Sequence, residues 1–370
     1  MSSPEDVRTS FAAAITLGLM EGKFFRNAKL FCLNLLLTYK DGCVGSCAYC
    51  GLSRARVTGE SWDKKSFIRV DWPTFRLDQI TSRMESKSCS HLERVCISMI
   101  THKKAPSDTL SILRYLRAKT DAISVLIAPT IVSKEWMYEA KKAGADKVGV
   151  AIDAATPELF EKLRGRGVSG PHKWERYWAA VEEAVDVFGR YNVGIHLIVG
   201  LGETEKEAIE TIYRGYCMGA FTHLFSFFPE ERSLMHRRKQ PPIGSYRRVQ
   251  LARYLVNIGK TSTDRLRFDK DGNLLDYGVD NSTINDAIES GIPFMTSGCS
   301  TKNMNNACNR PFSDSTPYQA SVGELRNFPF VPDQNDIITI RKQLLDYTTS
   351  SDALTGGVNN CLPPVPETIP

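Results

Sequence analysis

Three cysteines near the start of the chain have a spacing that suits iron–sulfur chemistry. Cys43, Cys47 and Cys50 lie in the stretch Cys-Val-Gly-Ser-Cys-Ala-Tyr-Cys, directly after an apolar run at 29–38 that is typical of a β-strand. Three thiolates in this C-x3-C-x2-C pattern can hold three irons of a [4Fe-4S] cluster. The fourth iron is then open to the amino and carboxylate groups of S-adenosylmethionine (SAM). The pattern therefore predicts radical chemistry.

Zinc is the main alternative metal for this stretch, because zinc sites also use C-x2-C pairs. A structural zinc site normally has four protein ligands, and no second C-x2-C pair follows in the chain. Tyr49, directly before Cys50, offers an aromatic face on which an adenine can stack. These points favour a cluster that binds SAM, while zinc and a group of buried thiols stay as alternatives.

The elements that must position this loop follow a repeated strand–helix alternation. Strands are predicted at 29–38, 94–100, 123–128, 147–152, 193–199, 223–228, 266–268 and 293–296. Helices are predicted between them at 74–85, 108–118, 134–143, 157–163, 174–188, 205–218, 245–258 and 283–290. Eight such alternations predict an α/β fold, a parallel (β/α)8 TIM-type barrel closed on itself. Active sites of such barrels lie at the carboxyl ends of the strands, which is where the cysteine loop begins.

Both ends of the chain lie outside the predicted barrel, which we place at 29–330. Residues 1–28 are predicted to form a short N-terminal helical extension, with a helix at 5–21. Residues 331–370 are predicted to form a C-terminal helix and an irregular tail, disordered from residue 350 onward, where glycine and proline are frequent.

Composition and charge argue against several classes of protein. Of the 370 residues, 42% are apolar and 24% are charged, which is ordinary for a globular protein with a large core. The formal net charge of +5 is too small to indicate nucleic-acid binding. The longest apolar run, 30–37, is too short to span a bilayer, and the N-terminus lacks the pattern of a signal peptide. We expect a cytoplasmic protein whose ten cysteines are metal ligands or free thiols rather than disulfides.

Several stretches, taken in order along residues 15–330, resemble the biotin synthase-like group of radical SAM enzymes. The cysteine loop continues as Cys-Gly-Leu-Ser-Arg at 50–54. Asp153, followed by Thr-Pro-Glu at 156–158, closes the fourth predicted strand, and Val-Gly-Leu-Gly-Glu at 199–203 closes the fifth. The resemblance implies the barrel of that group and SAM as cofactor, with the SAM ribose at the end of the fourth strand. The residues that we assign to SAM binding are Tyr49, Asp153, Arg164, Gly200 and Glu203.

The period of the strands suggests a second group of cysteines. Side chains alternate along a strand, so Cys32 shares a face with Asn34, and Cys96 shares a face with Ser98. In the fifth predicted strand a similar face carries His196. Such semi-polar faces suit a barrel interior that holds a site. The alternative is that both cysteines are small buried apolar residues and that His196 is a hydrogen-bonded interior histidine.

Two late cysteines are stronger candidates for this second site. Cys299, in Ser-Gly-Cys, is separated by eight residues from Cys308, in Cys-Asn-Arg-Pro, within the stretch 297–311. Because this stretch follows the last predicted strand, we expect it at the same rim of the barrel as the first cysteine loop. Cys299 and Cys308 are candidate ligands of an auxiliary iron–sulfur cluster, with Cys96 and Cys32 as further candidates; a structural loop with incidental thiols is the alternative. The remaining cysteines are interpreted as ordinary thiols: Cys89, Cys217 and Cys361.

The late motif is similar to that of the two-component lipoyl synthases of archaea and some anaerobic bacteria. His196, in Gly-Ile-His-Leu-Ile-Val-Gly-Leu-Gly-Glu, and the stretch Gly-Pro-His-Lys-Trp at 170–174 also resemble that family. The family's late cysteines are closely spaced, whereas eight residues separate them here, so the auxiliary ligand set stays open. Biotin synthase itself is a poorer match, because Gly194 stands at the position of one of its auxiliary-cluster cysteines, although Cys96 matches another.

This resemblance implies a reaction and its partners. Reduction of the [4Fe-4S] cluster cleaves SAM, and the resulting 5′-deoxyadenosyl radical takes hydrogen from an unactivated carbon of an octanoyl chain on a carrier lysine. The carbon radical then takes sulfur from the auxiliary iron–sulfur cluster, which completes one of the two sulfurations in lipoyl biosynthesis. The implied partners are an octanoylated lipoyl-carrier protein or domain, a second radical SAM subunit, and an electron donor such as ferredoxin or flavodoxin. Binding to nucleic acid or to a membrane is not expected.

Two basic segments follow the sixth predicted strand, Arg-Arg-Lys at 237–239 and Arg-Arg at 247–248. Lipoyl-carrier domains are usually acidic, so both segments are candidates to steer docking at the rim of the active site. Merely solvated charges on a surface loop are the alternative interpretation.

Two other functions stay open. A fragmentation or isomerisation enzyme of the same group would act on a small amino acid or cofactor precursor and would need no second cluster. An iron–sulfur scaffold protein would bind a cluster without cleaving SAM. The content of iron and sulfide separates the first alternative from sulfur insertion, and SAM cleavage separates the second.

Overall fold

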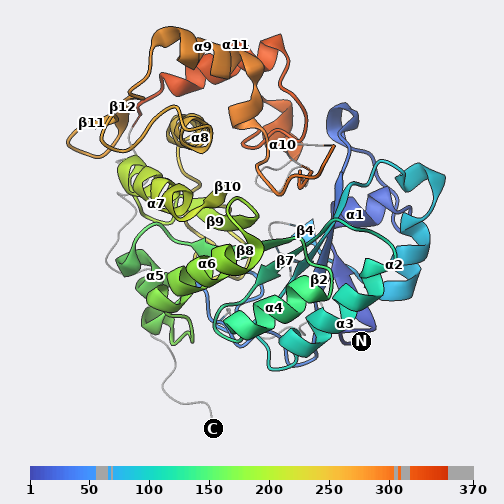
Figure 1. Ribbon diagram of the computed structural model, residues 1–370. Coiled ribbons are helices and arrows are strands. Elements are labelled where there is room, and N and C mark those ends of the chain that lie inside the picture. The colour runs from blue at the N-terminus through green and yellow to red at the C-terminus, as the bar shows by residue number, and fades with distance from the viewer. Residues whose placement is uncertain (56–65, 68–69, 304–306, 310–316, 349–370) are drawn as a thin grey trace.

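The fold is built on one twisted, mostly parallel sheet with helices packed along its outer side (Figure 1). The computed structural model describes residues 1–370 except 56–65, 68–69, 304–306, 310–316 and 349–370. In spatial order the strands are β10 (Ala220–Ser226), β9 (Val193–Val199), β8 (Lys147–Asp153), β7 (Ile123–Ile127), β6 (Arg94–Ser98), β2 (Cys32–Leu37), β1 (Asp6–Thr9) and β5 (Thr74–Arg76). The predicted α/β class, with a barrel-like arrangement of strands and helices, is confirmed.

The six strands from β10 to β2 are parallel and carry mainly buried apolar side chains, because helices cover their outer face. Helix α2 (Leu77–Met84) follows β5, and the helices that follow β6 to β10 are α3 (Ala105–Arg117), α4 (Lys134–Lys142), α5 (Pro157–Leu163), α6 (Trp174–Phe188), α7 (Glu205–Met218) and α8 (Ile243–Asn257). Side-chain caps start several of them: Thr204 accepts a hydrogen bond from the Glu207 amide, and the Glu207 carboxylate accepts one from Thr204 in return.

The predicted helix at 5–21 is wrong in its first half. Residues Asp6–Thr9 form β1, which pairs antiparallel with β2 through Val7 opposite Leu37, and only Phe11–Thr16 are helical, as α1. The chain offers a short extended segment to the open edge of β2, and the backbone hydrogen bonds and buried Val7 gained there outweigh helix propensity.

The last two predicted barrel strands also lie elsewhere. Arg267–Phe268, β11, pairs only with Leu274–Asp276, β12, in a separate hairpin. Ile292–Phe294 is a tight helical turn, and the neighbouring Met295 makes a single bridge to Phe328. Within the described residues, β10 and β5 are therefore the two end strands of the large sheet, and the predicted closure through two late strands is wrong.

The C-terminal third of the chain packs against α8. Figure 1 shows α9 (Asn281–Ser290) beside α11 (Gln334–Leu344), both next to α8, with α10 (Pro317–Ser321) nearby. Buried Leu251 and Leu255 of α8 contact an apolar cluster that includes Phe294, Ile337 and Ile340. A second short hairpin joins Ser66–Phe67 (β3) and Val70–Asp71 (β4). Among the described residues no helix combines the length and the apolar character needed to cross a lipid bilayer.

Candidate active site

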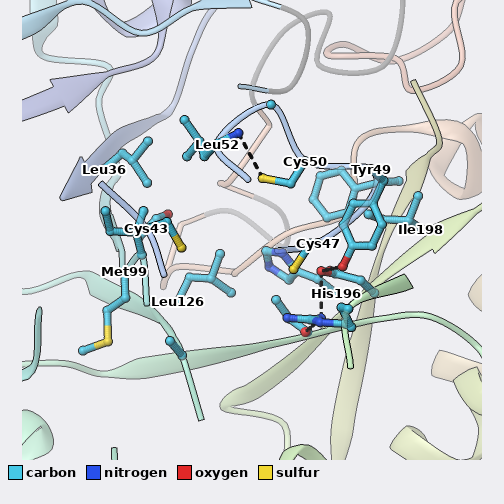
Figure 2. Close-up of a pocket in the computed structure, with 18 of the residues that line it drawn as sticks. Leu36, Cys43, Cys47, Tyr49, Cys50, Leu52, Met99, Leu126, His196 and Ile198 are labelled. Atoms are coloured by element: carbon cyan, nitrogen blue, oxygen red, sulfur yellow. Dashed lines mark hydrogen bonds and ion pairs between the residues drawn. The ribbon is translucent and has the colours of Figure 1, made fainter. Parts of the chain in front are cut away.

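A cavity of about 250 Å³ lies between the parallel strands and the cysteine loop (Figure 2). Cys43, Cys47 and Cys50 line it at the carboxyl ends of the strands, and Cys96 of β6 and His196 of β9 line it farther along the strands. Most of the wall is aliphatic or aromatic: Leu36, Leu52, Trp72, Met99, Ile100, Leu126, Ile127, Ile198, Phe225, Phe227 and Phe228. The cavity therefore extends from the cysteine loop to Cys96, and most of the wall between them is apolar.

The cysteine loop follows β2 and is tied to three neighbouring segments by backbone hydrogen bonds. The amide of Val44 donates to the carbonyl of Thr101 after β6 (2.9 Å), and the amide of Ala48 donates to Leu163 at the end of α5 (2.7 Å). The amide of Met235, in the segment after β10, donates to the carbonyl of Ala48 (3.2 Å). These hydrogen bonds to neighbouring segments fix the backbone of the loop, so its conformation does not depend on contacts between the three thiols.

The three thiols of this loop fit a metal cluster. The amides of Gly45 and Leu52 donate to the sulfurs of Cys43 (3.3 Å) and Cys50 (3.4 Å), as they can to cluster-bound thiolates. Burial raises the pKa of Cys47 to about 11 and raises that of Cys50 well above its usual value, so metal binding must drive the loss of both protons.

The structure brings three predicted SAM-binding residues together at the cavity wall. The Tyr49 hydroxyl donates to Oδ2 of Asp153 (2.6 Å), and Nη1 of Arg164 forms an ion pair with the same oxygen (2.9 Å). Arg164 is 4% exposed and also donates to the carbonyl of Ile152 (3.0 Å) and to the hydroxyl of Tyr177 (3.1 Å). Within the described residues, the contacts with Tyr49 and Arg164 are both made by Oδ2 of Asp153.

Asp153 itself has an uncommon backbone conformation. Its φ is 63°, in the left-handed region, at the point where the register between β8 and β9 shifts. A residue other than glycine adopts this conformation at a cost and is often found at functional sites. The ion pair with Arg164 and the hydrogen bond from Tyr49 hold the side chain in place despite this cost.

His172 is a site residue that the sequence pointed to only through a resemblance. Its Nδ1 lies 2.8 Å from Oγ1 of Thr130 and 2.9 Å from the hydroxyl of Tyr177. Its Nε2 faces the cysteine loop, since a Cβ placed on Gly45 would lie 3.0 Å from Nε2 and 3.3 Å from the sulfur of Cys43. Burial, followed by the charge of Arg164, lowers the pKa of His172 to about 2, so the ring is neutral. Thr130 and Tyr177 carry no sequence signal of this role.

Gly200 and Glu203 lie on the turn after β9 but are not among the residues that line the cavity. The Glu203 carboxylate accepts hydrogen bonds from the amides of Gly200, Leu201 (3.0 Å) and Gly202 (3.0 Å). Gly200 has a φ of 108° and lies against Pro241, so glycine is required there. These contacts make Glu203 a residue that shapes the turn, and its predicted contact with SAM stays a prediction.

Four cysteines from distant parts of the sequence form a second group: Cys32 of β2, Cys96 of β6, Cys299 and Cys308. The thiol of Cys32 is hydrogen-bonded with that of Cys308, and this bond, burial and the nearby Cys96 and Cys299 raise the pKa of Cys32. The amide of Cys308 donates to the carbonyl of Cys299 (3.2 Å), which folds the late segment back on itself. Burial raises the pKa of Cys299 to about 11, and burial with the charges of Cys308 and Cys299 raises that of Cys96.

The expected position of the late segment is wrong: it lies at the amino ends of the strands, opposite the first cysteine loop. Cys32 is the first residue of β2, and Asn309 anchors the segment there by accepting from the Phe31 amide (2.9 Å) and donating to the Lys29 carbonyl (2.7 Å). Arg94, the first residue of β6, donates to the carbonyl of Ser300 (2.7 Å). β2 alone separates its two ends by about 17 Å, at about 3.3 Å per residue. Arg310 and Pro311 of the late motif lie outside the described residues.

Polar groups around the four cysteines fit an iron–sulfur cluster. Ser124 lies opposite Cys96 in register, and its hydroxyl is hydrogen-bonded with the thiols of Cys96 and Cys299, which lowers the pKa of each thiol against the effect of burial. Nε2 of the buried His223 lies 3.9 Å from the sulfur of Cys299, and the ring is also hydrogen-bonded with the backbone of Ser297. Arg94 and Lys147 add positive charge that lowers the pKa of Cys299 against the effect of burial. Thiolates, donors and cations are what a negatively charged cluster requires.

The described residues contain no group of three or more His, Cys, Asp and Glu side chains that converge as they would on one metal ion. Around a single zinc the sulfurs would lie about 3.8 Å apart, given Zn–S distances of about 2.3 Å in a tetrahedron. In a cluster each thiolate binds a different iron, so its ligands do not have to meet at one point. Of the remaining cysteines, Cys89 is buried and Cys217 is exposed, and Cys361 lies outside the described residues.

The two basic segments have different environments. Arg247 and Arg248 belong to α8 and are buried, so their predicted docking role is wrong. Arg247 donates to the side chain of Gln250 (2.7 Å) and to the carbonyl of Arg326 (2.7 Å), and Arg248 pairs with buried Glu205 (2.6 Å). The segment 237–239 is exposed and follows Met235, whose amide contacts the cysteine loop.

Comparisons with known proteins agree with this arrangement at the level of the domain. Residues 37–213 match the family model described as the Radical SAM superfamily. No curated protein matches. Among solved structures, methylornithine synthase (PylB) is 13% identical, with 67% of each chain covered and a TM-score of 0.47. The [FeFe]-hydrogenase maturase HydG from Carboxydothermus hydrogenoformans is 15% identical, with 92% of this chain and 84% of that chain covered and a TM-score of 0.46. These likenesses carry no argument about the reaction.

Proposed function

We propose that the chain, whose residues 37–213 match the family model of the Radical SAM superfamily, is a radical SAM enzyme that inserts sulfur into an unactivated C–H bond. Its substrate in this proposal is a carrier-bound octanoyl chain, and the reaction is one of the two sulfurations of lipoyl biosynthesis. The observation that supports sulfur insertion most directly is the group of four cysteines, of which Cys96 also lines the cavity below the first cysteine loop.

Cys43, Cys47 and Cys50 would hold the first [4Fe-4S] cluster. When bound, this cluster supplies the electron that cleaves SAM to methionine and a 5′-deoxyadenosyl radical. Asp153 offers a carboxylate oxygen to a ribose hydroxyl, and the ion pair with Arg164 orients that carboxylate. Tyr49 packs beside Asp153, so its ring can border the adenine. These residues bind and orient SAM at the carboxyl ends of the strands.

Cys32, Cys96, Cys299 and Cys308 would hold the auxiliary cluster, which supplies the sulfur. Leu36, Leu126 and Ile198 line the cavity together with Cys96 of this group and the three cysteines of the first loop. The aliphatic and aromatic part of the wall suits an alkyl chain, which needs no polar partner, while Asn34, His196 and Glu230 also line the cavity. The apolar part of the lining is thus compatible with the aliphatic substrate of this proposal.

The carrier would dock at the carboxyl-end rim, because the four cysteines and the anchored late segment cover the opposite end. Exposed Arg237 and Lys239 offer positive charge there to an acidic lipoyl-carrier protein or domain. The same rim is where ferredoxin or flavodoxin could reach the first cluster. Because each component of a two-component system adds one sulfur, the proposal also includes a second radical SAM subunit.

The test is the content of iron and acid-labile sulfide after anaerobic reconstitution. We expect about eight irons per chain in the wild type and about four in both Cys299→Ala/Cys308→Ala and Cys43→Ala/Cys47→Ala/Cys50→Ala, as two four-iron clusters require. The exposed Cys217 provides the control, since Cys217→Ala should keep all eight. About four irons in both the wild type and the Cys299→Ala/Cys308→Ala variant would contradict sulfur insertion and favour a fragmentation or isomerisation enzyme. Failure of the reduced protein to form 5′-deoxyadenosine would favour a scaffold.

A further inference from the structure

His223 stands where the sheet meets the group of four cysteines. It lies in the middle of β10, opposite His196 of β9 in register, and is 6% exposed. Its Nε2 lies 3.9 Å from the sulfur of Cys299, within the range of an N–H···S hydrogen bond. The ring is also hydrogen-bonded with the backbone of Ser297. A buried imidazole with one nitrogen directed at a cysteine of a metal site is a common second layer of such sites.

The neighbouring strand makes room for this ring. A Cβ placed on Gly194 would lie 2.2 Å from Nε2 and 2.4 Å from Cδ2 of His223. Gly194 has no left-handed backbone conformation that would require glycine, since it is absent from the residues with positive φ. The space that it leaves is therefore the reason for glycine at this position, and the imidazole fills that space.

His196 does not take the same role. Its ring meets that of His223 edge to face, with centroids 5.5 Å apart, and it lines the apolar cavity. With the proton on Nε2, the ring of His223 presents a donor to the sulfur of Cys299.

We propose that His223 is a positioning residue of the auxiliary cluster, which donates from Nε2 to the sulfur of Cys299 and makes the cluster easier to reduce. The inference rests on the proposed function, since it requires a cluster at the four cysteines. A hydrogen bond to a ligand sulfur places positive charge where the added electron resides, and this stabilises the reduced state. Loss of the donor therefore shifts the reduction potential to more negative values.

The experiment measures the auxiliary cluster alone, in the Cys43→Ala/Cys47→Ala/Cys50→Ala background, by redox titration followed by electron paramagnetic resonance. His223→Phe should shift the potential to more negative values, and His223→Gln, whose amide can donate from the same place, should keep it. Gly194→Ala should shift it in the same direction as His223→Phe, because the added Cβ displaces the ring. His172→Phe is the matched control: this imidazole is equally buried, 3% exposed, but contacts the first cysteine loop, so the potential should not move.

Each outcome decides the proposal. An unchanged potential in His223→Phe with full iron content overturns it, and so does an equal shift in His223→Gln. If His223→Phe loses iron, retention of iron by His223→Gln supports the donor role, whereas loss in both variants overturns it. A background protein that binds no iron overturns the auxiliary cluster and the proposed function together. Four irons with an unmoved potential overturn only the role of His223.

Discussion

The two groups of cysteines differ in how the chain assembles them. Cys43, Cys47 and Cys50 lie within eight consecutive residues, on one loop at the carboxyl ends of the strands. Cys32, Cys96, Cys299 and Cys308 come from two strands and a late segment, and they meet at the amino ends. A site built by one loop leaves its spacing in the sequence, whereas a site built by the fold leaves only scattered cysteines.

The surroundings of the two groups differ as well. Near the first group, the carboxylate of Asp153 is paired with Arg164 and is placed to bind an organic cofactor. Near the second group, Arg94 and Lys147 add positive charge and His223 adds a donor, while no carboxylate pairs with the thiols among the described contacts. The first environment suits a cluster that shares its site with SAM, and the second suits a cluster held by protein alone.

The largest expected effect is on catalysis, because we expect each group of cysteines to be needed for a different step of the reaction. Cys47→Ala should reduce the formation of 5′-deoxyadenosine by more than about 100-fold, because loss of an outer-layer partner alone costs 10–100-fold at metal sites. Cys308→Ala should keep this SAM cleavage and lose the sulfurated product. Quantitation of both products by mass spectrometry checks the prediction. Equal loss of SAM cleavage in the two variants would show that the groups do not act separately.

The ion pair beside the first group should matter for stability as well as for SAM binding. Asp153→Asn leaves the buried Arg164 without its carboxylate, which should lower the free energy of unfolding by about 3–5 kcal/mol. Asp186→Asn, which breaks an exposed pair with Lys134, should cost less than about 1 kcal/mol. Urea unfolding of both variants measures the contrast. Similar small losses would mean that Arg164 finds other partners in the cavity.

A side chain added at Gly194, beside the second group, should be tolerated less well than one added at Gly149 on the neighbouring strand. Gly194→Ala should lower the free energy of unfolding by about 1–3 kcal/mol, because the new Cβ meets the imidazole of His223. Gly149, opposite Gly194 in register, is the control: a Cβ there meets the flexible end of Leu126 at 3.1 Å, so Gly149→Ala should be nearly neutral. Thermal and urea denaturation compare them. A larger loss in Gly149→Ala would contradict this description of the packing.

The smallest effect is a pH dependence confined to the rim of the first group. Burial raises the pKa of Glu203 to about 7 from its usual 4.5, despite the amides of its turn. A raised carboxyl pKa favours folding below pH 4.5, and this contribution disappears as the pH rises through 7. Because Glu203 is only partly buried, solvent screening reduces the effect of this shift, and the wild type should lose roughly 1 kcal/mol more than Glu203→Gln between pH 5 and pH 8. Parallel stability curves for the two proteins over this range would exclude the assignment.

Part of the fold was predictable because strand and helix periods are local. Six predicted strands correspond to β2 and β6 to β10, where apolar runs alternate with amphipathic helices. The strand Asp6–Thr9 was missed, because its four residues become a strand only through pairing with β2 and β5. The two late strands were wrong because a short apolar run does not reveal whether a sheet edge is near it.

The same limit applies to charged residues. Arg237 and Arg247 look alike in the sequence, yet the first is exposed on a loop and the second is buried in α8 among carbonyls and Gln250. No local pattern separates them. Their difference depends on which face of α8 packs against the late helices, and this is a property of the whole chain.

The sequence by itself determined the first cysteine loop, the α/β alternation around it, and the resemblance that links them to SAM, because all three are set by neighbours along the chain. Only the tertiary structure decided that Cys299 and Cys308 meet Cys32 at the amino ends of the strands, and that Gly194 makes room for His223. The physical reason is that the late segment is placed by its anchors, Asn309 on the Phe31 amide and Arg94 on the Ser300 carbonyl. Contacts between residues more than two hundred positions apart have no period or spacing from which they could be predicted.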